Sequence, residues 1–197
     1  MTDWTSLAYA VVDVEGNGQQ PPDLVELAVV PIVAGVIGEP RSWLVRPERS
    51  IKYFATRIHG LTNDDVADQP PFAAVADEVW DALNVSALVA HNAHVDTGVL
   101  QRELDNWQCP EAFDTLRLAK RLLPKQDSYQ LGVLVKALKL ADALPDGLVP
   151  HRATYDALVT ARLFVHLATA SDGQPLTLEV LRGQRTEERD DEPPSLF

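Results

Sequence analysis

Uninterrupted apolar stretches near the start of the chain predict a small set of buried strands. Residues 7–12 (LAYAVV) form a short continuous apolar run, which is typical of a central strand buried on both faces. Residues 24–33 predict a second strand and residues 42–45 a third. The segment 16–23, rich in Pro, Gly and Asn, is a connection. Connections this short favour antiparallel pairing over a crossover helix, so we expect a meander.

The pattern changes to helical spacing after Pro71. Phe72, Val75, Val79 and Leu83 recur at helical intervals and predict an amphipathic helix. A short apolar strand is expected at residues 87–90, and further helices are expected at residues 95–107, 115–122, 129–138 and 153–170. Strands first, followed by alternating strands and helices, indicate an α/β layer fold.

The composition is that of a globular protein. The chain has 197 residues, of which 46% are hydrophobic and 23% charged, and we expect one domain over residues 1–184. Residues 185–197 are polar, acidic and proline-containing, which predicts a flexible tail. No apolar run approaches the roughly 20 residues of a membrane helix. Because the first residues lack the basic and apolar regions of a secretory signal, a cytoplasmic location is expected.

Cysteine content and net charge limit the kinds of site and substrate that this chain can have. The single cysteine, Cys109, excludes an intramolecular disulfide and a cysteine-based zinc site. The formal net charge is −12, from 17 Lys and Arg against 29 Asp and Glu. An acidic surface repels phosphate backbones, which argues against a protein that grips long duplex DNA. Carboxylates that hold divalent cations would reverse this field locally, so we expect a small footprint on an anionic substrate.

Two acids stand at the end of the first predicted strand. Side chains alternate along a strand, so Asp13 and Glu15 point to the same side. Like charges at the end of a buried strand repel each other and lose hydration, which is costly unless a cation joins them. A divalent metal ion with oxygen ligands would compensate. Taken alone, two acids with this spacing are more often solvated residues of a turn than metal ligands.

Two later acids lie near the start of predicted helices. Asp96 follows the strand at residues 87–90 and lies on or beside the inward stripe of its helix, although the helix dipole alone also favours an acid there. Asp156 shares a helix face with mostly small or apolar residues, so it is expected to face inward. His151 precedes that helix, where a loop could carry it over a site, although a single loop histidine is more often a solvated surface residue. The combination in this order carries more weight than any one signal.

Together these residues resemble the motifs of the DEDDh exonucleases, a family of the DnaQ-like, ribonuclease-H-like superfamily. The matching motifs are Asp13-Val14-Glu15, then His91-Asn92-Ala93 through Asp96, and then His151 with Asp156 five residues later. Weaker family-like stretches lie at residues 58–62, 113–115 and 129–131. The resemblance covers about residues 7–170.

This resemblance implies a mixed sheet with an antiparallel second strand, flanked by helices, and a 3′–5′ exonuclease activity. By resemblance, two Mg²⁺ or Mn²⁺ ions would be held by Asp13, Glu15, Asp96 and Asp156, and His151 would be the general base. Two hard cations about 4 Å apart can bind the attacking water and the leaving 3′ oxygen at phosphorus. Nucleoside 5′-monophosphates would be released from a single-stranded DNA or RNA 3′ end or from a short oligonucleotide. Several family members dimerise, so a homodimer is a further expectation.

The resemblance also implies contacts with the substrate. The residues expected to make them are Val14, Gly16, Asn17, His59, His91 and Asn92. The first motif continues here as Gly16-Asn17-Gly18, where the family usually has Thr-Thr-Gly or a similar sequence. Val95 stands where the family usually has Phe. Both departures concern the substrate end of the site and leave the four acids and His151 in place.

Other functions fit the same residues. An oligoribonuclease-like enzyme or a specialised phosphodiesterase would use this set of five on very short or modified nucleotides. A non-catalytic scaffold is disfavoured, because none of the five is missing. Residues 193–197 (PPSLF) loosely resemble apolar peptides that dock on bacterial sliding clamps, although the usual Gln is absent. The tail is therefore a candidate contact with a clamp, alongside the simpler interpretation of a terminus with no role.

Overall fold

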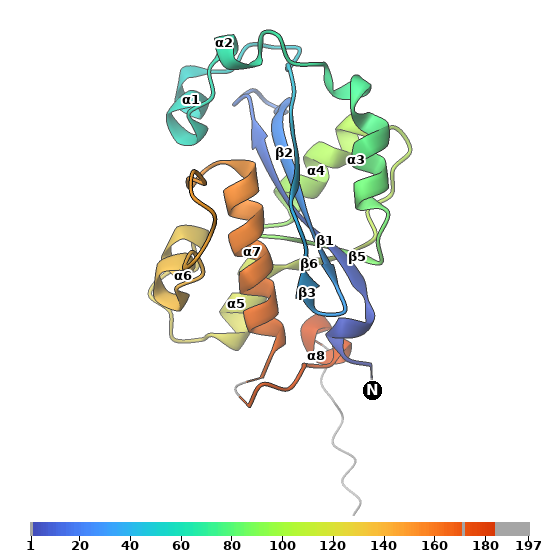
Figure 1. Cartoon of the computed structure of the whole chain (residues 1–197), viewed down its shortest axis with the longest axis vertical. Coiled ribbons are helices and arrows are strands. Elements are labelled where there is room, and N and C mark those ends of the chain that lie inside the picture. Colours follow the sequence, from blue (N-terminus) through green and yellow to red (C-terminus); the bar gives the residue numbers. More distant parts are fainter. Residues whose placement is uncertain (1, 171, 184–197) are drawn as a thin grey trace, which may run out of the picture.

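A mixed sheet forms the centre of the molecule (Figure 1). The computed structural model describes residues 2–170 and 172–183. The strands are β1 (Ala8–Gly16), β2 (Leu24–Val33), β3 (Val36–Ile37), β4 (Arg41–Leu44), β5 (Ala87–Ala90) and β6 (Glu111–Asp114). Their order in the sheet is β3-β2-β1-β5-β6, and β4 also pairs with β2. The predicted α/β layer fold with a mixed sheet is confirmed.

Strand directions follow the predicted meander. β2 pairs antiparallel with β1, β3 and β4, whereas β5 is parallel to β1 and β6 is parallel to β5. β1 continues to Gly16, beyond the apolar run that predicted it, because its pairing with β2 extends through the polar residues. In this register Glu15 lies opposite Glu26, and a bulge follows directly after Glu15. The acids at the end of β1 are therefore held by the sheet rather than by a free turn.

Helices cover both faces of this sheet. They are η1 (Trp4–Ser6), α1 (Tyr53–His59), α2 (Asn63–Val66), η2 (Phe72–Ala74), α3 (Ala76–Leu83), α4 (His94–Glu103), α5 (Thr115–Leu122), α6 (Leu131–Leu138), α7 (Ala153–Ala168) and α8 (Leu178–Arg182). The bounds of β5 and α5 are those predicted from the sequence. The helix expected at residues 72–83 is split at Val75, whose φ of −115° and ψ of 0° lie outside the helical region.

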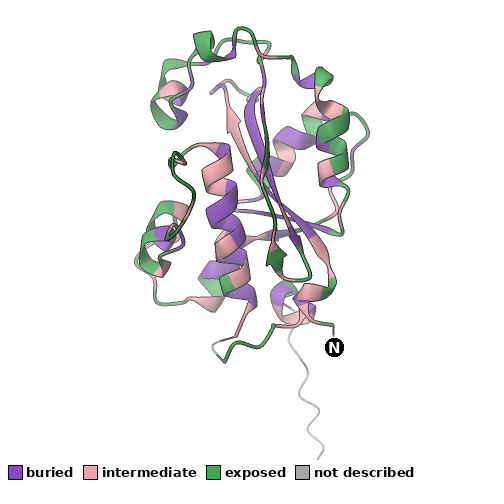
Figure 2. Ribbon diagram, viewed as in Figure 1, coloured by how far each residue is buried: buried purple, intermediate pink, exposed green. Residues whose placement is uncertain are grey.

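Alternation along β1 divides the core into two layers. Tyr9 and Val11 pack with Phe164 of α7, and Ala10 and Val12 pack with residues of α3 and α4. Figure 1 shows α5, α6 and α7 on one side of the sheet and α3 and α4 on the other. The side of α7 that faces the sheet is buried (Figure 2). Odd-numbered residues of β1 therefore face α7, and even-numbered residues face α3 and α4.

Two expectations concern the limits of the described chain. Among the described residues, no helix combines the length and the apolar character that crossing a membrane requires. The predicted acidic tail at residues 185–197, with its clamp-like end at residues 193–197, lies outside the described residues.

Candidate active site

Three of the predicted acids meet where β1 approaches its end. Asp13 and Glu15 continue the row of odd-numbered residues that faces α7. Asp156 lies in the first turn of α7, on the same side of the sheet. Carboxylate oxygens of Asp13, Glu15 and Asp156 all come within 4.8 Å of one another. Residues from distant parts of the sequence thus form one cluster of oxygen ligands.

The fourth predicted acid approaches from the opposite face. Asp96 is in the first turn of α4, which packs against the even-numbered side of β1, and it is 6% exposed. One of its carboxylate oxygens, Oδ1, accepts a hydrogen bond of 3.1 Å from the backbone N–H of Val14. Asp96 is therefore attached to β1 between the other two acids, but it does not belong to the group of three within 4.8 Å.

Burial and mutual repulsion raise the pKa values of the acids in this site. Burial raises the pKa of Asp13 well above its ordinary value, and the charges of Asp96 and Asp156 raise it further. Burial and the charge of Asp156 raise the pKa of Glu15 to about 8. Burial raises the pKa of Asp96 to about 7. Hard oxygen ligands that lose hydration and repel one another fit a divalent cation such as Mg²⁺ or Mn²⁺.

His151 lies at the open edge of the cluster. Its backbone N–H donates a hydrogen bond of 3.1 Å to Oδ2 of Asp156, and its ring Nδ1 is 4.0 Å from the same oxygen. The side chain is 63% exposed. The backbone is in the left-handed region, with φ at 63°, which turns the chain just before α7 begins. This arrangement holds the imidazole beside the carboxylates and leaves it open to solvent.

A small cavity of about 250 Å³ opens beside Glu15. Val14, Gly16 and His59, three of the predicted substrate contacts, are among the residues that line it, together with apolar side chains of α1 and α4. The Nδ1 atom of His59 accepts a hydrogen bond of 3.1 Å from the backbone N–H of Leu61. Its Nε2 is buried and has no hydrogen-bond partner among the described residues, and burial lowers the pKa of the ring.

His91 and Asn92, the predicted substrate contacts of the second motif, line a separate cavity of about 510 Å³. Both ring nitrogens of His91 have protein partners, Oγ1 of Thr115 at 2.9 Å and the carbonyl oxygen of Tyr129 at 3.0 Å. The backbone N–H of Asn92 donates to Oδ1 of Asp114 at 3.0 Å. His91 therefore connects the end of β5 to α5 and to the segment before α6, and only its ring carbons remain for contact with a substrate.

A larger groove of about 800 Å³ begins at the acid cluster. His151 and Asp156 line one end, and the rest runs along α6, where Lys136 and Lys139 belong to its walls. On a chain with a net charge of −12, the two lysines place cationic groups in a groove that reaches the cluster, and the acids Asp142 and Asp156 line the same groove.

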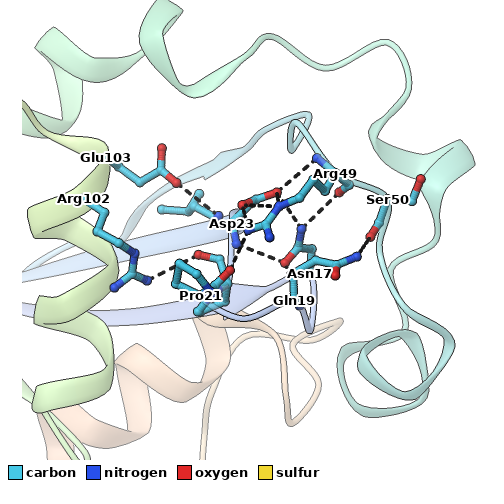
Figure 3. A network of polar contacts seen from close by, with 10 residues as sticks. Asn17, Gln19, Pro21, Asp23, Arg49, Ser50, Arg102 and Glu103 are labelled. Carbon is cyan, nitrogen blue, oxygen red and sulfur yellow. Dashed lines mark hydrogen bonds and ion pairs between the residues drawn. The ribbon is translucent and has the colours of Figure 1, made fainter.

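Asn17 occupies a different place from the one expected. Its side chain is fully buried and donates to Oδ2 of Asp23 at 2.7 Å and to the carbonyl of Arg49 at 3.0 Å. Its Oδ1 accepts from the backbone N–H groups of Gln19 and Asp23, both at 3.0 Å. Figure 3 shows this network, in which Arg49 also pairs with Asp23. The expectation that the Asn17 side chain contacts substrate is therefore corrected, because its amide is used to fix the loop at residues 17–23.

Clustered carboxylates on the central strand of a mixed sheet define the class, a metal-dependent nuclease with a ribonuclease-H-like fold. The family model of the RNase_T exonucleases matches residues 10–164. Exodeoxyribonuclease 10 of Escherichia coli K12 is 37% identical over 161 residues, which cover 82% of this chain and 69% of that protein. The chain therefore belongs to the RNase_T exonuclease family, and the predicted class of 3′–5′ exonuclease is confirmed.

Two further similarities agree with this assignment. The 3′–5′ exonuclease DinG of Bacillus subtilis is 35% identical over 166 residues, and the match covers 81% of this chain but only 17% of DinG. A solved structure of Exonuclease X in complex with 5′ overhanging duplex DNA is 34% identical, with a TM-score of 0.70. That match covers 85% of this chain and 97% of the other. The chain thus corresponds to a small part of some relatives and to nearly all of another chain.

The metal-free protein is expected to become more stable as the pH falls from about 9 to about 5. Folding raises the pKa of Glu15 to about 8 and that of Asp96 to about 7, so the folded state binds more protons than the unfolded state in this range. Stability then increases until the pH approaches the unfolded carboxyl values near 4. Melting curves recorded in EDTA would measure this trend, and added Mn²⁺ should stabilise most at high pH. A Tm that rises with pH in EDTA would contradict this account of the cluster.

Proposed function

We propose that this chain is a DNA-directed 3′–5′ exonuclease that releases nucleoside 5′-monophosphates with two bound Mg²⁺ or Mn²⁺ ions. The single observation that carries the proposal is the approach of the Asp13, Glu15 and Asp156 oxygens to within 4.8 Å at the end of β1. These three carboxylates and Asp96 would hold the ions. When bound, divalent cations supply positive charge that lowers the pKa of the attacking water and offsets charge developing on the phosphate.

The proposed role of His151 is to accept a proton from the attacking water. An imidazole exchanges protons near neutral pH, which suits a general base. The ring is exposed and lies beside Asp156, so water and a phosphate can reach it. The backbone N–H of the same residue donates to the Asp156 carboxylate, which orients that ligand independently of the ring. In this proposal one residue has two separable functions, through its main chain and through its side chain.

The cavity beside Glu15 is the proposed site for the terminal nucleoside. Its walls combine main chain at Val14 and Gly16 with the apolar side chains of Phe54, Ile58 and Val95. Both Phe54 and Ile58 are 54% exposed, so they provide apolar surface on which a base can pack. Val95 fills less space than the Phe usual in the family. We propose that the cavity accepts a base by stacking and shape, which makes it tolerant of base identity.

The groove along α6 favours a polymer over a dinucleotide. It continues from Asp156 and His151 past Lys136 and Lys139, whose ammonium groups suit the phosphates of a strand. DNA is favoured over RNA by the similarity to an exodeoxyribonuclease and to a structure that contains duplex DNA. An enzyme restricted to very short oligonucleotides would have no use for the extended groove. The groove therefore distinguishes the proposal from the oligoribonuclease-like alternative.

Matched DNA and RNA single strands of graded length, labelled at the 5′ end, would test this assignment. We expect a ladder of products shortened from the 3′ end, free nucleoside 5′-monophosphates, and a higher kcat/KM for DNA than for RNA. The value of kcat/KM should rise with length until the strand spans the groove. A strand blocked with a 3′ phosphate serves as the control for end dependence. Preference for dinucleotides, or products shortened from the 5′ end, would overturn the proposal.

A further inference from the structure

An ion pair between the buried Glu26 and the partly exposed Arg152 lies directly beside the acid cluster. Glu26 interrupts the apolar sequence of β2, is 5% exposed and stands opposite Glu15 in the sheet. The guanidinium of Arg152 donates two hydrogen bonds to it, from Nε to Oε2 at 2.9 Å and from an Nη atom to Oε1 at 2.6 Å. Paired, parallel hydrogen bonds of this kind fix the geometry of both partners more tightly than a single contact does.

The same carboxylate also caps α7. Oε2 of Glu26 accepts a hydrogen bond of 3.0 Å from the backbone N–H of Ala153, the first residue of the helix. The N-cap residue, Arg152, makes no capping hydrogen bond with its own side chain. The free N–H groups at a helix start need an acceptor, and here β2 supplies it. Glu26 therefore joins the start of α7 to the sheet by three hydrogen bonds from two consecutive residues.

Position along the chain makes this junction important for the site. His151 immediately precedes Arg152, and Asp156 follows Ala153 within the first turn of α7. Both groups that α7 and its preceding loop contribute to the site are therefore set by where the helix starts. Glu15, on the neighbouring strand, is in register with Glu26, so the pair links the two sides of the cluster. The positive charge of Arg152 also acts on Glu15 and offsets part of the repulsion there.

We infer that Glu26 and Arg152 are positioning residues that set the distance between the acids of β1 and the Asp156–His151 group, and thereby the metal affinity of the site. This inference rests on the proposed metal-dependent function. Mg²⁺ requires near-ideal ligand geometry, so a shift of one ligand relative to the others weakens its binding. Residues that orient metal ligands without touching the metal typically change affinity or activity by about 10–100-fold when they are replaced.

The chain contains a matched control for this pair. Arg182 of α8 donates two hydrogen bonds of 2.7 Å to Glu111 of β6, the same chemistry in a different part of the fold. Glu111 and Arg182 line a cavity that contains none of the four acids or His151. The test variants are Glu26→Gln and Arg152→Lys, and the control variants are Glu111→Gln and Arg182→Lys. Arg152→Lys keeps the charge and removes the paired geometry, so it remains informative where Glu26→Gln folds poorly.

The decisive measurement is the binding of Mn²⁺ to the full chain without DNA. Electron paramagnetic resonance of the free ion reports how much Mn²⁺ is bound. We expect Glu26→Gln and Arg152→Lys to lower Mn²⁺ affinity by about tenfold or more. At saturating Mn²⁺ their kcat on a DNA single strand should fall while KM changes little. The control variants should lower Tm at most and keep both Mn²⁺ affinity and kcat. A melting curve for each variant fixes a temperature at which all are folded.

Failure of the proposed function and failure of the positioning role give different results. If the parent protein binds Mn²⁺ but degrades no DNA, the proposed function fails. If the parent protein is active and the Glu26→Gln and Arg152→Lys variants keep its Mn²⁺ affinity and kcat, the positioning role is overturned. Equal losses in the test and control pairs would also overturn it, because the effect would then reflect general stability. Loss confined to the Glu26–Arg152 pair supports the inference.

Discussion

Asp13→Asn is expected to abolish exonuclease activity and at the same time to stabilise the metal-free protein. Asp13 is the acid whose pKa is raised by burial and by the most neighbouring carboxylates, so neutralising it removes repulsion from the folded state. Asn keeps the size of the side chain but loses the charge that a hard cation requires. A loss of several kcal/mol of transition-state stabilisation corresponds to a fall in kcat of about 10³-fold or more.

Activity on a DNA single strand and Tm in EDTA, measured on the same preparation, would check both parts. Each kcal/mol of stabilisation should raise Tm by roughly 2–4 °C for a protein of this size. Asp68→Asn is a suitable control, because Asp68 is exposed and lies outside the cluster. A variant that loses activity and also melts earlier in EDTA would show that Asp13 is needed for folding. A variant that keeps full activity would remove Asp13 from the proposed site.

His151→Asn is expected to lower kcat by about 10²–10⁴-fold while Mn²⁺ binding is retained, because a general base contributes that much to a proton-transfer step. Asn is the informative replacement, since the backbone of His151 has φ at 63° and Asn adopts the left-handed region more readily than most residues. The hydrogen bond to Asp156 comes from the backbone N–H and survives the change. The ring is exposed, so its removal leaves no buried cavity.

Single-turnover rates over a range of pH, together with Mn²⁺ titrations, would measure this effect. The part of the pH–rate profile that reports the base should disappear in the variant. His166→Asn is the matched control, because His166 is an exposed histidine in the last turn of α7, remote from the helix start that carries Asp156. A loss of Mn²⁺ affinity in His151→Asn would place the ring among the groups that hold the metal. An unchanged rate would exclude it as the base.

Most of the acid cluster could be predicted because strand alternation is local. The spacing of Asp13 and Glu15 fixed their shared side, and the inward face of α7 indicated Asp156. The position of Asp96 was harder, because it depends on which face of the sheet α4 covers. That face is set by the crossover from β5 through α4 to the parallel strand β6, which no local pattern specifies. The substrate and metal roles of these residues remain predictions.

Other parts could not be predicted from local patterns. β6 has the sequence EAFD, with Phe113 as its one buried residue, so neither alternation nor an apolar run marks it. The inward turn of Asn17 depends on Asp23 and on Arg49, a partner far along the chain. One signal in the sequence does indicate a residue outside the motifs. Glu26, a charged residue within an apolar strand, needs a hydrogen-bonding partner, and Arg152 within the third motif provides it.

The assembly of the cluster from β1 and α7, which are far apart in the sequence, has a consequence for biosynthesis. A ribosome delivers β1 with Asp13 and Glu15 early and α7 with Asp156 late, so the growing chain carries two of the acids long before the third exists. Until α7 docks, the apolar row that precedes those acids on β1 lacks the cover that α7 provides. Docking of α7 therefore covers this part of the core and completes the acid cluster in one event. With the proposed roles of these acids, we expect nuclease activity to begin only after α7 has docked.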